Sequence, residues 1–74
     1  MNLLKAMIIA KNETEFEILM KMIAEETSLQ IIKITNEFPK TIVVFGSELH
    51  IIIFEKMIEL RNDNIELLEK CMQH

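Results

Sequence analysis

The hydrophobic and polar positions of this chain form short segments of two kinds, one alternating residue by residue and one with the spacing of a helix. Residues 3–10 and 29–35 alternate, which predicts two β-strands. Between them a helix is predicted, because apolar residues recur three or four positions apart at Phe16, Leu19, Met20 and Ile23. Asn12 or Thr14 can cap its start, and Thr14 with Glu17 has the spacing of a capping box.

The segment from Thr41 to Glu55 predicts a β-hairpin with two apolar faces. Gly46-Ser47 is interpreted as its loop, because glycine supplies the positive φ that a type II′ turn needs. Alternation along the two strands gives one face that holds only apolar residues, which are Ile42, Val44, Leu49, Ile51 and Ile53. The other face holds Val43, Phe45, Ile52 and Phe54, interrupted by Thr41, Glu48 and His50.

An alternative interpretation of the same segment is a helix that Ser47 caps. One side of that helix would carry Leu49, Ile52, Ile53, Lys56, Met57 and Leu60, and spacing alone does not exclude it. The strand is favoured because consecutive isoleucines followed by Phe54 suit pleated structure. The Gly-Ser pair also matches the chemistry of a hairpin loop.

The predicted fold is a single α+β domain over residues 1–74. Residues 62–64, Asn-Asp-Asn, interrupt the chain, and residues 65–72 predict a short final helix with Cys71 facing inward. The order is then β-α-β-β-β-α, a mostly antiparallel sheet with two helices packed on one face. No motif carries a family resemblance. The order of the first elements resembles the ferredoxin-like pattern, whose final strand this interpretation lacks.

The outward face of the predicted sheet is the candidate functional surface. Two short helices cover one face of a sheet, so the other face is left to contact a partner. That face is predicted to carry Val43, Phe45, His50, Ile52 and Phe54, joined by Met7, Ile9 or Ile31. An exposed apolar patch of this kind marks an interaction site. We therefore expect these residues to form an interface, most simply with a second copy of the chain.

The composition argues against several classes of function. The net charge is −4 and the lysines are scattered, which argues against nucleic-acid binding. The alternative function is that of a nucleic-acid-binding regulator, whose dimerisation would gather these lysines into one basic surface. A single glycine excludes a phosphate-binding loop. Cys71 and His74 are spaced like half of a zinc site, but the other ligands are missing, so no bound metal is predicted. No cofactor, catalytic residue or enzyme activity is predicted either.

The apolar runs of the sequence are too short to cross a bilayer, and the chain shows no secretory leader pattern. A cytoplasmic protein without membrane contact is therefore expected. Its predicted role is that of a small acidic interaction module, a homodimer that binds an unidentified protein and modulates or inhibits it. Inhibitors from phages and mobile elements are one possibility, and the wealth of Ile, Lys, Asn and Glu fits an AT-rich genome.

Overall fold

A computed structural model describes residues 2–61 and 65–73 of the chain. Its elements in chain order are β1 (Leu3–Ala10), α1 (Glu13–Glu26), β2 (Gln30–Ile34), β3 (Lys40–Ser47), α2 (Glu48–Leu60) and β4 (Leu67–Gln73). The predicted α+β class, with two helices and a four-stranded antiparallel sheet, is confirmed. The order β-α-β-β-α-β is the ferredoxin-like, or split βαβ, pattern.

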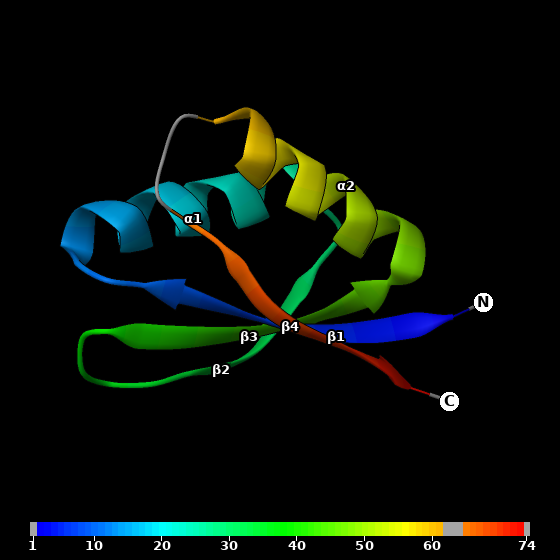
Figure 1. The fold of residues 1–74 in the computed structure, drawn as a ribbon, viewed down its shortest axis with the longest axis horizontal. Helices are drawn as coiled ribbons and strands as arrows, with labels where there is room; N and C mark the ends of the chain where they lie inside the picture. The colour runs from blue at the N-terminus through cyan, green and yellow to red at the C-terminus, as the bar shows by residue number, and fades with distance from the viewer. Residues whose placement is uncertain (1, 62–64, 74) are drawn as a thin grey trace.

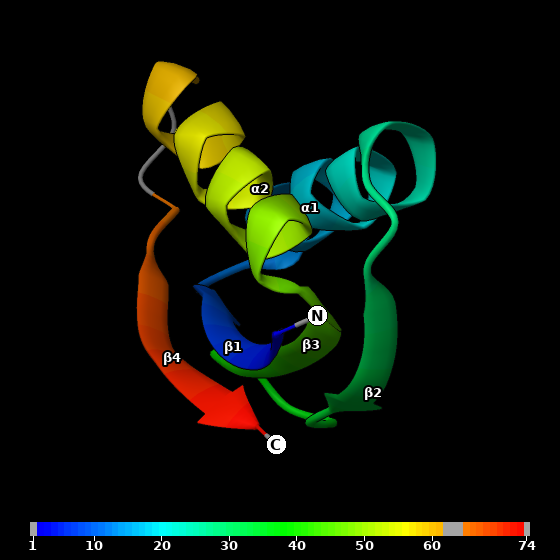
Figure 2. The same ribbon diagram turned by 90° about the vertical axis from the view of Figure 1, so that its right-hand side faces the viewer.

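The four strands form one sheet in the order β2-β3-β1-β4, and each neighbouring pair is antiparallel. The central pair runs in register from Leu3 opposite Ser47 to Ala10 opposite Lys40. Both helices lie on the same side of this sheet (Figures 1 and 2). The opposite side of the sheet therefore has no element over it within the described chain.

The hydrophobic core fills the space between the sheet and the two helices. Every second residue of the central strands is buried there, because successive side chains of a strand point to opposite faces. The core consists of Leu4, Ala6, Ile8 and Ala10 from β1, Ile42 and Val44 from β3, Leu19, Met22 and Ile23 from α1, Ile51, Phe54 and Ile58 from α2, and Ile65.

The helix that the periodicity predicts is confirmed as α1, and Asn12 is its N-cap. The backbone N–H of Glu15 donates to Asn12 Oδ1 at 3.0 Å. Glu15 in turn accepts from the backbone N–H of Lys11 at 2.9 Å. The cap is therefore Asn12 rather than Thr14, and its side chain satisfies one of the free N–H groups of the helix start. Glu15 reaches back to the residue before the cap, whereas the N3 side chain of a capping box bonds the cap residue itself.

The predicted hairpin over residues 41–55 is wrong, because its second half is the helix α2. Ser47 is the N-cap of α2, and its Oγ accepts from the backbone N–H of His50 at 3.2 Å. Ile51, Phe54 and Ile58 lie on one side of this helix and are buried in the core. Burial of that side against the sheet outweighs the preference of isoleucines for strands, a preference that depends strongly on context.

Gly46 lies within β3 and has no positive φ, so the predicted turn at Gly46-Ser47 is also wrong. A side chain at this position would place its Cβ 2.6 Å from Leu29 Cδ2, so glycine leaves room for Leu29 over the sheet. The hairpin of the structure instead joins β2 to β3. There the backbone N–H of Thr35 donates to the carbonyl of Thr41 at 3.1 Å, and the N–H of Thr41 donates to Thr35 Oγ1 at 2.8 Å.

The predicted final helix over residues 65–72 is wrong as well, since this segment contains the strand β4. β4 pairs with β1, with Lys5 opposite Cys71 and Met7 opposite Glu69. Without β4 the backbone N–H and C=O groups along one edge of β1 would lack partners in the sheet, and buried backbone groups need such partners. Pairing with β1 thus outweighs the helical spacing, and Cys71 is exposed rather than inward-facing.

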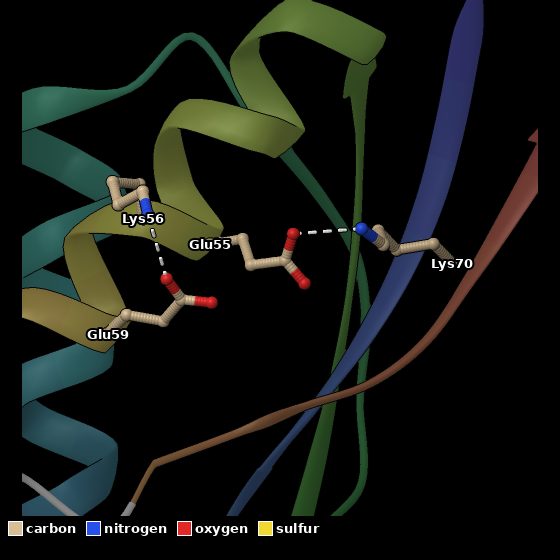
Figure 3. Close-up of polar contacts among 4 residues, drawn as sticks. All are labelled: Glu55, Lys56, Glu59 and Lys70. Carbon is tan, nitrogen blue, oxygen red and sulfur yellow. Dashed lines mark hydrogen bonds and ion pairs between the residues drawn. The ribbon is translucent and has the colours of Figure 1, made fainter.

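An ion pair connects β4 to the helix layer. Lys70 Nζ lies 2.8 Å from Glu55 Oε1 of α2, and the two side chains are 39% and 32% exposed (Figure 3). A second pair, Lys56 with Glu59 at 3.2 Å, lies within α2 and is 68% and 58% exposed (Figure 3). The first pair joins two elements, whereas the second joins neighbouring turns of one helix.

Replacing Phe54 should separate a core role from an interface role. Phe54 is 0% exposed, so Phe54→Ala should lower the free energy of unfolding by about 3–5 kcal/mol. Ile52 on the same helix is 47% exposed, and Ile52→Ala should cost about 1 kcal/mol or less. Urea unfolding followed by circular dichroism measures both, with Phe54→Leu as a milder variant. Equal losses for Phe54→Ala and Ile52→Ala would contradict this core.

The Lys70–Glu55 pair should contribute modestly to stability. A double-mutant cycle with Lys70→Met and Glu55→Gln should give a coupling free energy of about 0.2–1 kcal/mol that shrinks as salt is added. The same cycle on Lys56 and Glu59, with Lys56→Met and Glu59→Gln, is the matched control and should give a smaller coupling because both side chains are more exposed. A larger coupling in the control would contradict the connection of β4 to α2.

Candidate interaction surface

The side of the sheet that faces away from the helices presents cross-strand rows of side chains, two of which extend over all four strands. The strand registers place Gln30, Phe45, Lys5 and Cys71 in the first row and Lys33, Val43, Met7 and Glu69 in the second, each given in the order β2, β3, β1, β4. We call these eight residues the sheet face. The residues between them along the central strands are in the core, so this arrangement follows from the pleat alone.

A β-bulge in β2 decides which residues of that strand join the sheet face. The pairing with β3 shifts between Ile31 and Lys33, so Ile31 is opposite Val44 whereas Lys33 is opposite Val43. In a strictly alternating strand Ile31 and Lys33 would share a face. The bulge instead directs Lys33 to the sheet face while Ile31 packs against the core, and the extra residue Ile32 is 50% exposed.

The sheet face is hollow rather than flat. A depression of about 460 Å³ lies over it, lined by Lys5, Met7, Ile32, Lys33, Val43, Glu69 and Cys71. Its floor is formed by the central strands, where Met7 and Val43 are half-buried even though no element covers them. Its charged groups include Lys33 on the edge strand β2 and Glu69 on the edge strand β4. The surface therefore combines an apolar centre with opposite charges at its two edges.

The thiol of Cys71 lies on this surface and is hydrogen-bonded to Glu69. Its Sγ donates a hydrogen bond to Glu69 Oε1 at 3.2 Å, and this bond raises the pKa of the thiol because it is lost when the thiolate forms. The negative charge of Glu69 acts in the same direction, and the nearby Lys5 opposes it. An exposed cysteine with a raised pKa is a poor nucleophile, so this thiol does not resemble a catalytic one.

The helix α2 carries a second exposed apolar surface. Its outer side presents Leu49, Ile52, Ile53 and Leu60, which are 63%, 47%, 42% and 79% exposed. We call these four residues the α2 stripe. Because Ile51, Phe54 and Ile58 fill the opposite side, α2 carries apolar residues on both sides, with the exposed Lys56 among those of the outer side. The helical interpretation of the sequence named this outer side, together with Lys56 and Met57, and did not name the side that is buried.

The structure distributes the predicted interface residues over four places. Val43 and Phe45 lie on the sheet face, together with Met7. Ile52 lies on the α2 stripe, and Phe54 lies in the core, 0% exposed. His50 is half-buried in the first turn of α2, with its Nδ1 2.7 Å from Ser47 Oγ. The prediction that these residues share one face is wrong, because a helix rather than a strand follows Ser47; their role in an interface stays a prediction.

Further features of the described residues bear on function. No three His, Cys, Asp or Glu side chains among residues 2–61 and 65–73 are close enough together to hold a metal ion. The predicted Cys71–His74 pair falls partly outside the described chain. Neither described helix has the length and apolarity that crossing a membrane requires.

Comparison with protein-family models, with curated proteins and with solved structures gave no match for this chain. The two exposed apolar surfaces are therefore the basis on which function can be argued, because a fold alone does not define one.

The reactivity of Cys71 should report the hydrogen bond to Glu69. Glu69→Gln removes the carboxylate that raises the pKa of the thiol, so more thiolate exists at a given pH. We expect alkylation by iodoacetamide at mildly alkaline pH to become several-fold faster, with a midpoint at lower pH than in the wild type. Measurement at sub-micromolar protein concentration separates this effect from association. Glu66→Gln is the control, and equal rates for all three proteins would contradict the contact.

Proposed function

We propose that this protein is a protein-interaction module that works as a homodimer, with the sheet face contacting a second copy and the α2 stripe contacting and modulating another protein. The observation that carries the proposal is the presence of two apolar surfaces on opposite sides of a two-layer domain. Monomeric proteins rarely leave contiguous apolar patches exposed, and such patches mark sites of association.

Self-association through the sheet face is favoured over pairing of strand edges. The edge strand β2 is short and bulged at Ile32, and the pairing of β4 with β1 shifts between Met7 and Ile8. Bulges of this kind twist an edge away from a new strand and protect it against pairing. In the second row of the sheet face the central residues Val43 and Met7 are apolar and the edge residues Lys33 and Glu69 are charged. Interfaces commonly have an apolar centre and a polar rim.

The α2 stripe supports the second part of the proposal, a contact with a different protein. It lies on the far side of the helix layer from the sheet face, so a dimer formed through the sheet would leave both copies of the stripe accessible. Leu49, Ile52 and Ile53 are spaced as anchors of a helix that packs along an apolar groove. Occupying such a groove on a cytoplasmic target would modulate or inhibit it.

Nucleic-acid binding is the second candidate, and one observation favours it. Phe45, Lys5 and Lys33 share the sheet face, and open four-stranded sheets can bind single-stranded RNA by stacking bases on aromatic residues of the central strands. Phe45 is the one aromatic residue in the two rows, Glu69 lies on the same surface, and the net charge is −4. Stacking and phosphate contacts are therefore both weak here, and a protein partner is favoured.

Substitutions on the two surfaces should have separate effects. The wild-type protein should show a molar mass approaching twice the 8.7 kDa of the chain in a light-scattering concentration series. Val43→Glu should shift it to the monomer without unfolding, because this side chain points away from the core and a carboxylate would have to be desolvated at the apolar centre of the interface. Ile52→Glu should leave the dimer intact and remove proteins that the wild type captures from a host lysate.

Two results would contradict this division of roles. A wild type that stays monomeric up to millimolar concentration would exclude self-association through the sheet face. Salt-dependent binding of labelled single-stranded RNA or DNA that Val43→Glu abolishes and Ile52→Glu leaves unchanged would favour the nucleic-acid alternative. Circular dichroism of both variants provides the control that each remains folded.

A further inference from the structure

We propose that two copies pack their sheet faces together around a two-fold axis that runs parallel to β1 and β3, so that Lys33 of each copy faces Glu69 of the other. This inference rests on the proposed function, because it specifies how the homodimer is built. It is drawn from the strand order and from the charges of the sheet face.

The strand order determines which residues meet in such a dimer. The order is β2-β3-β1-β4, so a two-fold axis between the central strands and parallel to them places β3 over β1 of the second copy and β2 over β4. An axis in this direction keeps each cross-strand row opposite the same row of the second copy. In the second row, Lys33 then faces Glu69 and Val43 faces Met7.

The residues brought together in this way are chemically complementary. Lys33 and Glu69 carry opposite charges at the rim, and the symmetry creates that pair twice. Val43 and Met7 form an apolar contact at the centre. In the first row Phe45 faces Lys5, where an ammonium group can lie over the aromatic ring. Each copy therefore supplies both members of every pair, as a self-complementary interface requires.

The alternative in-plane axis, perpendicular to the strands, gives an unfavourable arrangement. It places β2 over β2 and β4 over β4 of the second copy. With the axis through the second row, Lys33 would face Lys33 and Glu69 would face Glu69. Like charges that face each other across an interface disfavour this orientation. With the axis midway between the two rows, Lys33 would face Gln30 and Glu69 would face Cys71, so neither charge would meet an opposite one. The charges thus distinguish two packings that the apolar centre alone would not.

The monomer leaves these charges available for a partner. Lys5 and Lys33 make no ion pair with the described residues, and Glu69 makes only the hydrogen bond from Cys71. Lys33 and Glu69 are exposed at opposite edges of the hollow, too far apart across four strands to neutralise each other. A second copy supplies the missing counter-charge at both edges.

Charge exchange at Lys33 and Glu69 tests the pairing. Lys33→Glu alone places two carboxylates opposite each other, and Glu69→Lys alone places two ammonium groups opposite each other, so each variant should dimerise at least about tenfold more weakly than the wild type. An equimolar mixture of the two variants restores opposite charges at both sites. The mixture should therefore form a heterodimer of wild-type strength, measured by sedimentation equilibrium. Lys56→Glu, the same charge change on α2, is the control and should dimerise normally.

Each outcome of this experiment supports the pairing or overturns it. Weak single variants and a restored mixture support it. Single variants that dimerise like a dimeric wild type overturn the pairing and leave the proposed function standing. A heterodimer of wild type with Lys33→Glu that is stronger than either homodimer overturns it in favour of the perpendicular axis. A wild type that does not dimerise overturns the pairing and the homodimeric part of the proposed function together. Thermal melts of each variant exclude unfolding as the cause.

Discussion

The constraint on which this structure depends is that two short helices can cover only one side of a four-stranded sheet. The helices α1 and α2 seal Ala6, Ile8, Ile42 and Val44 into a core, and the chain contains no further helix among its described residues to cover the other side. Because strands alternate, the same central strands that supply the core also present Met7 and Val43 outward. The exposed apolar surface is therefore a direct consequence of two strands that are apolar on both faces.

The helix α2 has the same property in another form. It packs on the sheet through Ile51, Phe54 and Ile58, yet Leu49, Ile52 and Ile53 remain in solvent on its outer side. A domain that has a single core between its sheet and its helices, and exposed apolar groups on both outer surfaces, resembles a component of a larger assembly. The acidic side chains that give the net charge of −4 oppose indiscriminate association, and Lys33 and Glu69 place opposite charges on the two edge strands of the sheet face.

The local patterns of the sequence predict about half of this fold. The strands β1 and β2 and the helix α1 follow from periodicity, and the outward direction of Val43 and Phe45 follows from alternation. The segment after Ser47 satisfies strand and helix patterns alike, because its isoleucines are consecutive, and the burial of Ile51 and Phe54 in the core is a long-range effect. The segment of β4 has helical spacing and becomes a strand through pairing with β1. The bulge that turns Lys33 outward is not predicted by the local sequence pattern either.

The most direct test of whether the sheet face meets a second copy is a set of isotope-filtered nuclear Overhauser measurements. A sample that mixes ¹³C-labelled and unlabelled chains reports contacts between copies only. Contacts from the Val43 methyl groups of one copy to the Met7 methyl group of the other, together with contacts between Phe45 and the Lys5 side chain, are the predicted result. Contacts between copies that involve only Leu49, Ile52 and Ile53, or none at concentrations where light scattering shows a dimer, would contradict it.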